Sequence, residues 1–439
     1  MKFNLKKLIA AILCFVMVLS LCACGSDKEE ENGEVNNNPG EAATVTGPVT
    51  IEFWHTRAGD HGTLLDEQIK RFNETNKLGI TVVGTYQGSY YDVLSKVKTA
   101  YGTNMAPTMV LVGAGGIEEL AENGALTDMA AYVKRDNWNV ANIPESLQYY
   151  MKHYENQIIE FPYLVSSAVI YYNKAYYSAE PTSLENFAAM AQSITANNPG
   201  ITGMGIGLDT GFIQRPILRS LGAPGLTLGG GDKPALLEDN YLTTLMNDWK
   251  SWIDGGYCAT VNVTDSSSKM RTDFLNGKLA AFVSSSADMK TVMEDCKSMG
   301  VELGVAKFVG YGGYCAPIGG GGIGVLDTAS SQEVAAAWEF IKFLFEDQQV
   351  IENAVRTGYL PYTYSAGQHA DMIAYWNENP ITKVAYDQLE YATYNEWSVY
   401  LEQWRDKIAA AFTYVITDKS MTPEQAMNFL KTQAEAIFP

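Results

Sequence analysis

The sequence predicts an α/β protein whose folded part forms two lobes. Its 439 residues suffice for two or three domains of roughly 150 residues. Apolar residues make up 46% and charged residues 18%, which is a globular composition. Strand patterns alternate with helical patterns from Val49, and a second such series begins near Val169. This alternation indicates βαβ units and a largely parallel sheet.

The first region contains three strand patterns and two helical ones. Val49, Ile51 and Phe53 alternate with polar residues, as in a half-buried strand. Apolar residues at helical spacing follow. The further expected elements, in chain order, are a helix with Leu65, Ile69 and Phe72, a strand over 80–85, a helix with Tyr91, Leu94 and Val97, and a strand over 108–112.

The second region continues the alternation. The expected elements are a strand over 169–172, a helix over 184–196, strands over 279–283 and 323–326, and a helix over 331–346. A glycine-rich stretch over 310–322 is expected to interrupt the pattern. The last helix has a marked start, because Thr422 and Gln425 form a T-x-x-Q capping box and Pro423 suits the first turn.

The first 23 residues are predicted to be a secretory signal peptide. Three lysines precede an apolar run over 8–21, which is shorter than the roughly 20 residues that a spanning helix needs. A membrane-anchor helix is the alternative. The run ends in LCACG, which resembles the lipobox of bacterial lipoproteins and implies cleavage before Cys24 and lipidation of its sulfur. Residues 24–48 would then be the lipidated Cys and a polar, disordered tether, and the protein would face outside the cytoplasm on the cell membrane.

The charge and cysteine counts exclude several classes of protein. The chain has 50 acidic and 31 basic residues, a net charge of −19, which argues against nucleic acid or an anionic lipid surface as a partner. Three cysteines would remain outside the signal and the anchor. They are Cys258, Cys296 and Cys315. An odd number implies at least one free thiol.

No motif in the sequence indicates catalysis, a metal or a cofactor. The four histidines lack zinc-site spacing, and neither G-x-S-x-G nor a P-loop occurs. His55 and His61 could share a site, but a surface or hydrogen-bonded role is favoured. The run 319–324 (GGGGIG) matches G-x-G-x-x-G, yet a strand pattern follows where a dinucleotide site needs a helix. With 26 Tyr, 8 Trp and 16 Phe, the chain has many side chains suited to the walls of a binding site. We therefore expect a binding protein rather than an enzyme.

From about residue 49 to the end, the chain resembles the extracellular solute-binding proteins of ABC importers, in the carbohydrate-type family. The segments that carry the resemblance are 51–55 (IEFWH), 106–108 (APT), 171–174 (YYNK), 274–280 (FLNGKLA), 323–325 (IGV) and 357–361 (TGYLP). The resemblance implies a type II periplasmic-binding-protein fold, similar to maltose-binding protein, with a ligand cleft between two lobes. Lobe 1 would comprise 49–163 plus 314–350, and lobe 2 would comprise 164–313 plus 351–439. The implied partners are a small-molecule solute, two permease subunits and their ATPase, and the protein is expected to be a monomer.

Within the family the chain is most similar to the glycerol-3-phosphate-binding proteins, through F-W-H, Y-x-G-x-Y at 86–90, T-G-Y-L-P and Q-x-R at 403–405. This likeness implies a set of ligand-binding residues. They are Tyr90, Ser166, Phe212, Ser285, Gly319, Tyr359 and Arg405. Phe212 stands where these relatives have a Trp, and Ala114 stands where they have a Glu that binds the glycerol hydroxyls. The phosphate half of the site is therefore kept, and the polyol half is altered.

The chemistry of these residue types agrees with an anion site. The guanidinium of Arg405 can bind phosphate through two parallel hydrogen bonds, serine hydroxyls can donate to phosphate oxygens, and Gly319 lets backbone N–H groups approach an anion. Three hypotheses stay open at this point. The first is a receptor for glycerol-3-phosphate or a glycerophosphodiester, the second a receptor for a neutral sugar or oligosaccharide, and the third a surface-anchored carbohydrate-active enzyme.

Overall fold

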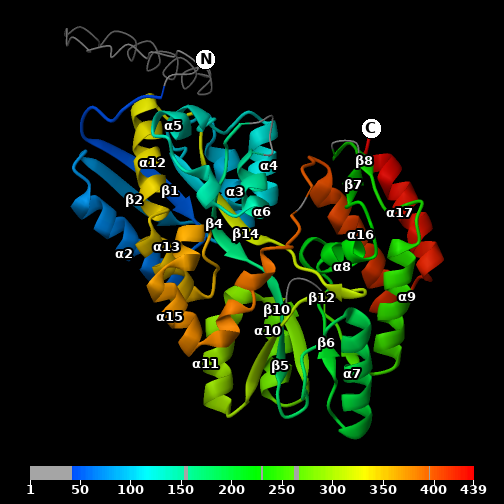
Figure 1. Cartoon of the computed structure of the whole chain (residues 1–439). Coiled ribbons are helices and arrows are strands. Elements are labelled where there is room, and N and C mark those ends of the chain that lie inside the picture. The colour runs from blue at the N-terminus through cyan, green and yellow to red at the C-terminus, as the bar shows by residue number, and fades with distance from the viewer. Residues whose placement is uncertain (1–41, 153–156, 229–230, 262–265, 395) are drawn as a thin grey trace, which may run out of the picture. The chain divides into compact units, whose positions relative to one another are not determined.

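The structure is a computed structural model that describes residues 42–152, 157–228, 231–261, 266–394 and 396–439 (Figure 1). The chain divides into two compact units, Met1–Gly40 and Glu41–Pro439, and only the second contains described residues. The expected signal peptide, the expected lipidation at Cys24 and most of the expected tether lie outside the described residues. Within the described ranges, no helix is long and apolar enough to cross a membrane.

The first sheet has five strands in the order β2-β1-β3-β14-β4. The strands are β2 (Ile80–Tyr86), β1 (Val49–His55), β3 (Met109–Gly113), β14 (Gly319–Val325) and β4 (Phe161–Ser166). The helices that pack on it include α2 (Gly59–Thr75), α3 (Tyr90–Ala100) and α12 (Ser331–Leu344). Phe53 of β1 meets Phe340 of α12, and Phe340 meets Phe72 of α2 at 5.1 Å between ring centroids, so the apolar face of each helix closes one core.

The second sheet also has five strands, in the order β11-β5-β10-β6-β9. The strands are β11 (Leu303–Lys307), β5 (Ala168–Asn173), β10 (Ala281–Ser285), β6 (Met204–Gly205) and β9 (Cys258–Ala259). Its helices are α7 (Leu184–Asn197), α10 (Ser266–Leu275) and α11 (Met289–Met299). Phe282 of β10 stacks on Tyr171 of β5 and contacts Phe274 of α10, each at 5.1 Å between ring centroids.

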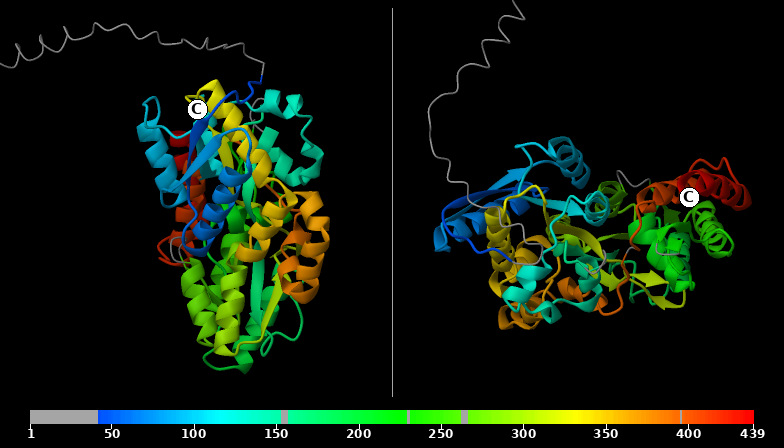
Figure 2. Two further views of the ribbon diagram at one scale, coloured as in Figure 1. Left: turned by 90° about the vertical axis from the view of Figure 1, so that its left-hand side faces the viewer. Right: turned by 90° about the horizontal axis from the view of Figure 1, so that it is seen from above.

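A helical group packs beside the second sheet and shares a separate core with the residues that alternate with Tyr171 and Phe282 along β5 and β10. It consists of α8 (Arg215–Ser220), α9 (Tyr241–Asp254), α16 (Leu401–Ile416) and α17 (Pro423–Ile437). Seen from above, α16 and α17 (red) lie on the opposite side of the unit from β1 and β2 (blue) (Figure 2). The fully buried Trp249 of α9 and Phe412 of α16 hold this group together, with ring centroids 5.9 Å apart.

The remaining elements are shorter or peripheral. The helices are α4 (Ala114–Glu122), α5 (Ala130–Arg135), α6 (Glu145–Lys152), α13 (Asp347–Thr357), α14 (Tyr364–Gln368) and α15 (Ala370–Glu378). The single turns are η1 (Val140–Asn142), η2 (Thr210–Gln214), η5 (Ser286–Asp288), η6 (Pro380–Lys383) and η7 (Tyr386–Gln388). The two short hairpins pair β7 (Thr227–Leu228) with β8 (Lys233–Pro234) and β12 (Val309–Gly310) with β13 (Gly313–Tyr314).

Helix starts follow the capping signals in the sequence. The predicted capping box of the last helix is confirmed, because Thr422 accepts from the backbone N–H of Gln425 and Gln425 accepts from that of Thr422. Ser89 with Asp92 and Ser330 with Glu333 form the same box at α3 and α12. Each cap satisfies backbone N–H groups that the first helical turn leaves unpaired.

Two expectations about the strands are wrong. The sheets are mixed rather than largely parallel, because β14 pairs antiparallel with both β3 and β4, and β5 pairs antiparallel with both β10 and β11. The glycine run does not delay the strand until 323, since β14 already begins at Gly319. Glycine fits there because the strand runs against Tyr90 and Glu160, whose side chains occupy the space that Cβ atoms on Gly321 and Gly322 would need.

The chain passes between the two sheets at three places that lie side by side. Ser167 alone separates β4 from β5, and its hydroxyl donates to the carbonyl of Pro317, 2.8 Å away. The segment that carries Pro317 leads into β14. Thr393 pairs with it in turn, donating to the carbonyl of Ala316 at 2.8 Å and accepting from Ile318 at 3.0 Å. These bonds join the three crossings into one narrow connection.

Two features concern the expected domain division. Within the described end of the expected tether, Thr46 donates to Gln332 of α12 at 2.9 Å, so order begins a few residues before Val49. Helix α13 packs against α2, and the backbone N–H of Leu360 donates to Val165 of β4 at 2.7 Å. The lobe boundaries given above stay a prediction.

Candidate functional site

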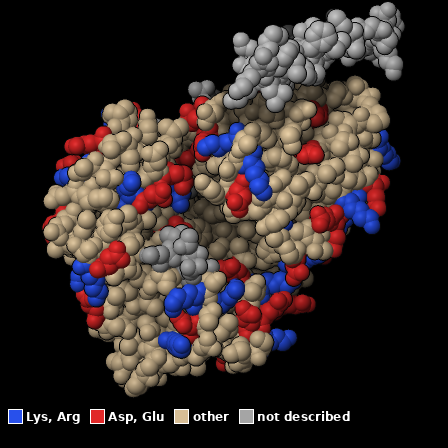
Figure 3. All heavy atoms as spheres, turned by 180° about the vertical axis from the view of Figure 1, so that it is seen from behind, with Lys and Arg blue, Asp and Glu red and all other residues tan. Residues whose placement is uncertain are grey.

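A cavity of about 740 Å³ lies where the two sheets meet. Its walls come from β4 and β14 of the first sheet, the starts of α3 and α4, the end of β10, the turn η2 and the first turns of α16. Figure 3 shows one face of the protein hollowed between its two halves, with acidic side chains close to the hollow. Six of the seven residues expected to bind ligand line this cavity. They are Tyr90, Ser166, Phe212, Ser285, Gly319 and Arg405.

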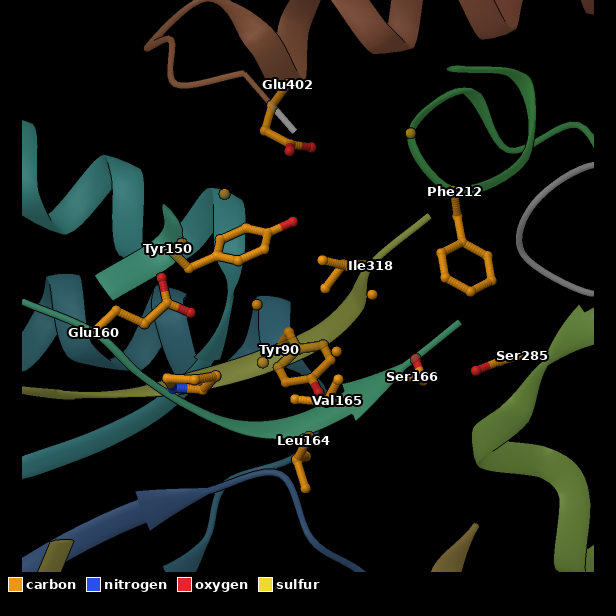
Figure 4. A pocket seen from close by; sticks show the side chains of 18 of the residues that line it. Tyr90, Tyr150, Glu160, Leu164, Val165, Ser166, Phe212, Ser285, Ile318 and Glu402 are labelled. Atoms are coloured by element: carbon orange, nitrogen blue, oxygen red, sulfur yellow. The ribbon is translucent and has the colours of Figure 1, made fainter. Parts of the chain in front are cut away.

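One end of the cavity brings two serines under an aromatic ring. Ser166 ends β4 and Ser285 ends β10, and their hydroxyls point toward one another below Phe212 (Figure 4). The oxygen of Ser285 accepts from the N–H of Ala287 at 3.2 Å, which leaves its hydroxyl hydrogen able to donate elsewhere. A Cβ on Gly319 would lie 2.5 Å from the Phe212 ring, so glycine is what allows the ring to rest on the backbone of β14.

Arg405 reaches the cavity from α16 and is held by two carboxylates. Its Nη1 donates to Glu402 at 2.6 Å, and its Nη2 lies 3.9 Å from Asp209. Its Nε is buried and has no hydrogen-bond partner among the described residues. The guanidinium is flat against the backbone of Gly211, where a Cβ would lie 2.4 Å from Nη2. Of the five N–H groups of the guanidinium, only one on Nη1 has a hydrogen-bond acceptor among the described residues, so the fork retains donors for a ligand.

Tyr359, the seventh expected residue, does not line the cavity. It lies behind Tyr90, whose hydroxyl is hydrogen-bonded to that of Tyr359, and burial raises the pKa of both phenols. On its other side lies Arg57, with the guanidinium carbon 5.5 Å from the Tyr359 ring centroid. The arrangement makes Tyr359 a support for Tyr90 rather than a wall of the cavity.

Behind Tyr359 lie the two histidines of the first region. Burial, followed by the charge of Arg57, lowers the pKa of both His55 and His61 to about 4, so both are neutral at physiological pH. The Nδ1 of His55 accepts from the N–H of Arg57 at 3.2 Å, which confirms a hydrogen-bonded role. Among the described residues, no group of three or more His, Cys, Asp or Glu side chains could hold a metal ion.

The carboxylates of the cavity are functional residues that no sequence pattern marked. Among the described residues that line it, five are acidic and only Arg405 is basic. The acidic residues are Glu119, Glu160, Asp209, Glu402 and Asp406. They come from four separate parts of the chain, and with 50 acidic residues in the sequence no local pattern marks these five. The site is therefore negative around its one guanidinium.

Two of the carboxyls in this region are deeply buried. Glu160, which immediately precedes β4, is 4% exposed, and burial raises its pKa from 4.5 to about 8. Glu118 of α4 lies behind the wall, and burial, followed by the charges of Glu402 and Glu160, raises its pKa well above the usual range. Both groups are protonated through part of the range in which an exposed glutamate is ionised. Through Glu160 the cavity thus offers a neutral carboxylic acid as well as carboxylates.

Comparison with known proteins identifies the family. Residues 67–381 match the family described as bacterial extracellular solute-binding protein. The chain belongs to this family. Its members are the receptors of ABC importers, which bind small solutes outside the cytoplasm and deliver them to a permease. The predicted class is therefore confirmed, and the chain is a binding protein rather than an enzyme.

Two kinds of relative stand out. The chain is 24% identical over 377 residues to the sn-glycerol-3-phosphate-binding periplasmic protein UgpB of Salmonella typhimurium, covering 80% of this chain and 82% of that protein. UgpB from Mycobacterium tuberculosis, in complex with glycerophosphocholine, has a TM-score of 0.76 at 22% identity, covering 89% of this chain and 98% of that one. The cyclic alpha-maltosyl-1,6-maltose binding protein from Arthrobacter globiformis has the same TM-score at 16% identity, covering 89% and 99%.

These structural likenesses confirm the predicted two-lobed α/β fold of the maltose-binding-protein type. They do not select a solute, since the similar structures include receptors for a phosphodiester and for sugars.

Proposed function

We propose that this solute-binding protein captures a glycerophosphodiester and that the phosphate is held between Arg405, Ser166 and Ser285. The observation that carries the proposal is the unpartnered, buried Nε of Arg405, in a cavity that Ser166 and Ser285 also line. A buried N–H without a partner is unfavourable, and a phosphate oxygen supplies the missing acceptor. The residue types expected from the resemblance agree with this assignment.

The charge of the cavity favours a diester over glycerol-3-phosphate itself. A phosphomonoester carries close to two negative charges at neutral pH, whereas a phosphodiester carries one. Glu402 and Asp209 already share the guanidinium of Arg405, so each added negative charge on the ligand is repelled at short range. A diester whose second substituent is neutral or positively charged suits the surplus of carboxylates. UgpB from Mycobacterium tuberculosis, solved with glycerophosphocholine, supports the same choice.

Titration calorimetry on the purified protein tests this proposal. We expect heat with a glycerophosphodiester and a weaker response to glycerol-3-phosphate. Arg405→Ala should abolish binding, and Arg405→Lys should weaken it strongly, because an ammonium keeps the charge but loses the planar fork. Arg71→Lys is the matched control, since Arg71 pairs with Glu352 outside the cavity. Silence with all phosphoesters, together with binding of a maltodextrin, would refute the proposal.

A neutral sugar or oligosaccharide is the second candidate solute. The observation that favours it is the pairing of Arg405 with Glu402, which neutralises the one cation of the cavity. Carboxylates and aromatic faces together are also suited to sugar hydroxyls and ring faces. One experiment with Arg405→Ala separates the two candidates. Loss of phosphoester binding supports the phosphodiester, and maltodextrin binding that the substitution leaves unchanged supports the sugar.

The proposal includes a lipid anchor at Cys24 and action as a monomer. The lipobox resemblance supports the anchor, and several acyl chains on one residue give stable membrane attachment. We expect the wild-type protein in the membrane fraction and Cys24→Ser in the medium or the periplasm. Light scattering should give the mass of a single chain. A Cys24→Ser protein that stays in the membrane fraction would contradict the anchor.

A further inference from the structure

Glu160 is a buried carboxyl that faces the cavity. It is 4% exposed, and among the described residues it makes no hydrogen bond or ion pair. Its side chain lies against β14, where a Cβ on Gly322 would fall 2.1 Å from the carboxyl oxygen. The carboxyl points into the cavity beside Tyr90 and Tyr150 (Figure 4).

The other acidic side chains of the wall differ from Glu160, because three of them are paired and the fourth, Asp406, is exposed. Glu402 accepts from Arg405, and Glu119 pairs with Lys98 at the surface. Asp209 accepts from the backbone N–H of Phe212 at 2.9 Å. These groups are satisfied within the protein, whereas the hydrogen-bonding capacity of Glu160 is open toward the cavity.

An unsatisfied buried carboxyl is unfavourable, and proteins pair nearly all such groups. Since no described residue supplies that partner and Glu160 lines the cavity, its partner is a group that occupies the cavity, a water molecule in the empty receptor and the solute in the loaded one. A carboxylic acid both donates through its O–H and accepts through its C=O, which matches hydroxyl groups that likewise do both. Burial favours this neutral form of Glu160. A phosphate does not suit this end of the cavity, because it offers acceptors only and meets the nearby carboxylates.

We propose that Glu160 is a specificity-determining residue whose carboxyl binds the hydroxyl groups of the solute at one end of the cavity, while Arg405 binds its anionic group. This inference rests on the proposed function, in that the same cavity holds the solute. The ring of Tyr150 lies beside the carboxyl, and that of Tyr90 lies farther along the same wall, so both offer apolar faces to the carbon chain that bears the hydroxyls (Figure 4). The glycerol end of a glycerophosphodiester has this chemistry.

The test compares two probes that differ only in their hydroxyls, glycerophosphocholine and propylphosphocholine. We expect wild-type protein to bind the glycerol compound at least tenfold more tightly, because a site built to bond a hydroxyl rejects the analogue that lacks it. In Glu160→Ala that preference should disappear, with both probes bound about as weakly as propylphosphocholine binds wild type. Glu160→Gln, which keeps the shape and both donor and acceptor, should retain part of the preference.

Glu118→Gln is the matched control. It removes a buried carboxyl from the same region, but Glu118 does not line the cavity. A preference that survives in Glu160→Ala would overturn the inference, as would a preference lost equally in Glu118→Gln, since a general field effect would then explain it. If Glu160→Ala does not fold, the comparison of Glu160→Gln with Glu118→Gln decides the same question.

The failure of the proposed function has a different signature. If wild type binds neither phosphodiester but binds maltotriose, the phosphodiester assignment is wrong. The role of Glu160 toward hydroxyls is then measured with maltotriose. At least a tenfold loss in Glu160→Ala supports the inference, and unchanged affinity overturns it.

Discussion

Replacing Glu160 by Gln should make the stability of the protein less dependent on pH. Burial raises the pKa of Glu160 from 4.5 to about 8. Between these two values the folded protein binds one proton that the unfolded chain releases. The contribution of Glu160 to the free energy of unfolding therefore falls as pH rises from about 4.5 to 8 and is level above that.

The size of the effect follows from the width of that window. Each pH unit corresponds to about 1.4 kcal/mol for one proton, so the ionised carboxyl lowers stability above pH 8 by about 5 kcal/mol relative to its neutral form. Glu160→Gln has the same shape and no titration. The difference in unfolding free energy, variant minus wild type, should rise by several kcal/mol from pH 5 to pH 9.

Urea unfolding at five pH values across this range measures that difference. Taking the difference cancels the groups that titrate alike in both proteins. Glu74→Gln on the surface of α2 is the control, since the side chain of Glu74 is 64% exposed, and its difference should stay flat. A flat difference for Glu160→Gln as well would refute the reasoning, because it would mean that the Glu160 carboxyl titrates as if solvated.

Three further predictions concern other parts of the molecule. Gly211→Ala should weaken solute binding tenfold or more and destabilise the fold by about 1–3 kcal/mol, because the added methyl would lie 2.4 Å from the Arg405 guanidinium. Calorimetry measures the affinity and thermal melting the stability. An unchanged affinity would contradict the prediction. Tyr359→Phe removes the hydrogen-bond partner of the buried Tyr90 hydroxyl and should lower the free energy of unfolding by about 1–3 kcal/mol. Tyr364→Phe at an exposed position should leave that free energy unchanged. The three free thiols should react with a thiol reagent only after unfolding, since all are buried and burial raises their pKa; fast reaction of the native protein would be the contrary result. They are Cys258, Cys296 and Cys315.

Local patterns in the sequence predicted the main elements of the fold. The strand expected from Val49 is β1, and the strand expected over 80–85 is β2. The helices expected over 184–196 and 331–346 are α7 and α12, with ends within two residues. These predictions held because alternation and helical spacing reflect burial on one face, which is a local property.

Strand direction and the acidic side of the cavity were not predictable in this way. A strand has the same alternation whichever way it runs, so the antiparallel insertion of β14 between β3 and β4 leaves no trace in the pattern. Glu160 and Glu402 are 242 positions apart in the sequence and meet only through the fold. The resemblance to glycerol-3-phosphate-binding proteins pointed to six residues that do line the cavity, yet it contained nothing about the carboxylates that share it. Their roles in binding stay predictions.

The narrow connection between the sheets also forms part of the solute cavity. Ser166 and Gly319 line the cavity, and each lies within two residues of the Ser167–Pro317 hydrogen bond that joins two of the crossings. Any change in the angle between the sheets must be taken up by backbone torsions in this short stretch, which also shapes the floor under the solute. A solute that contacts Ser166 and Gly319 therefore touches the same few residues that set the angle between the two sheets.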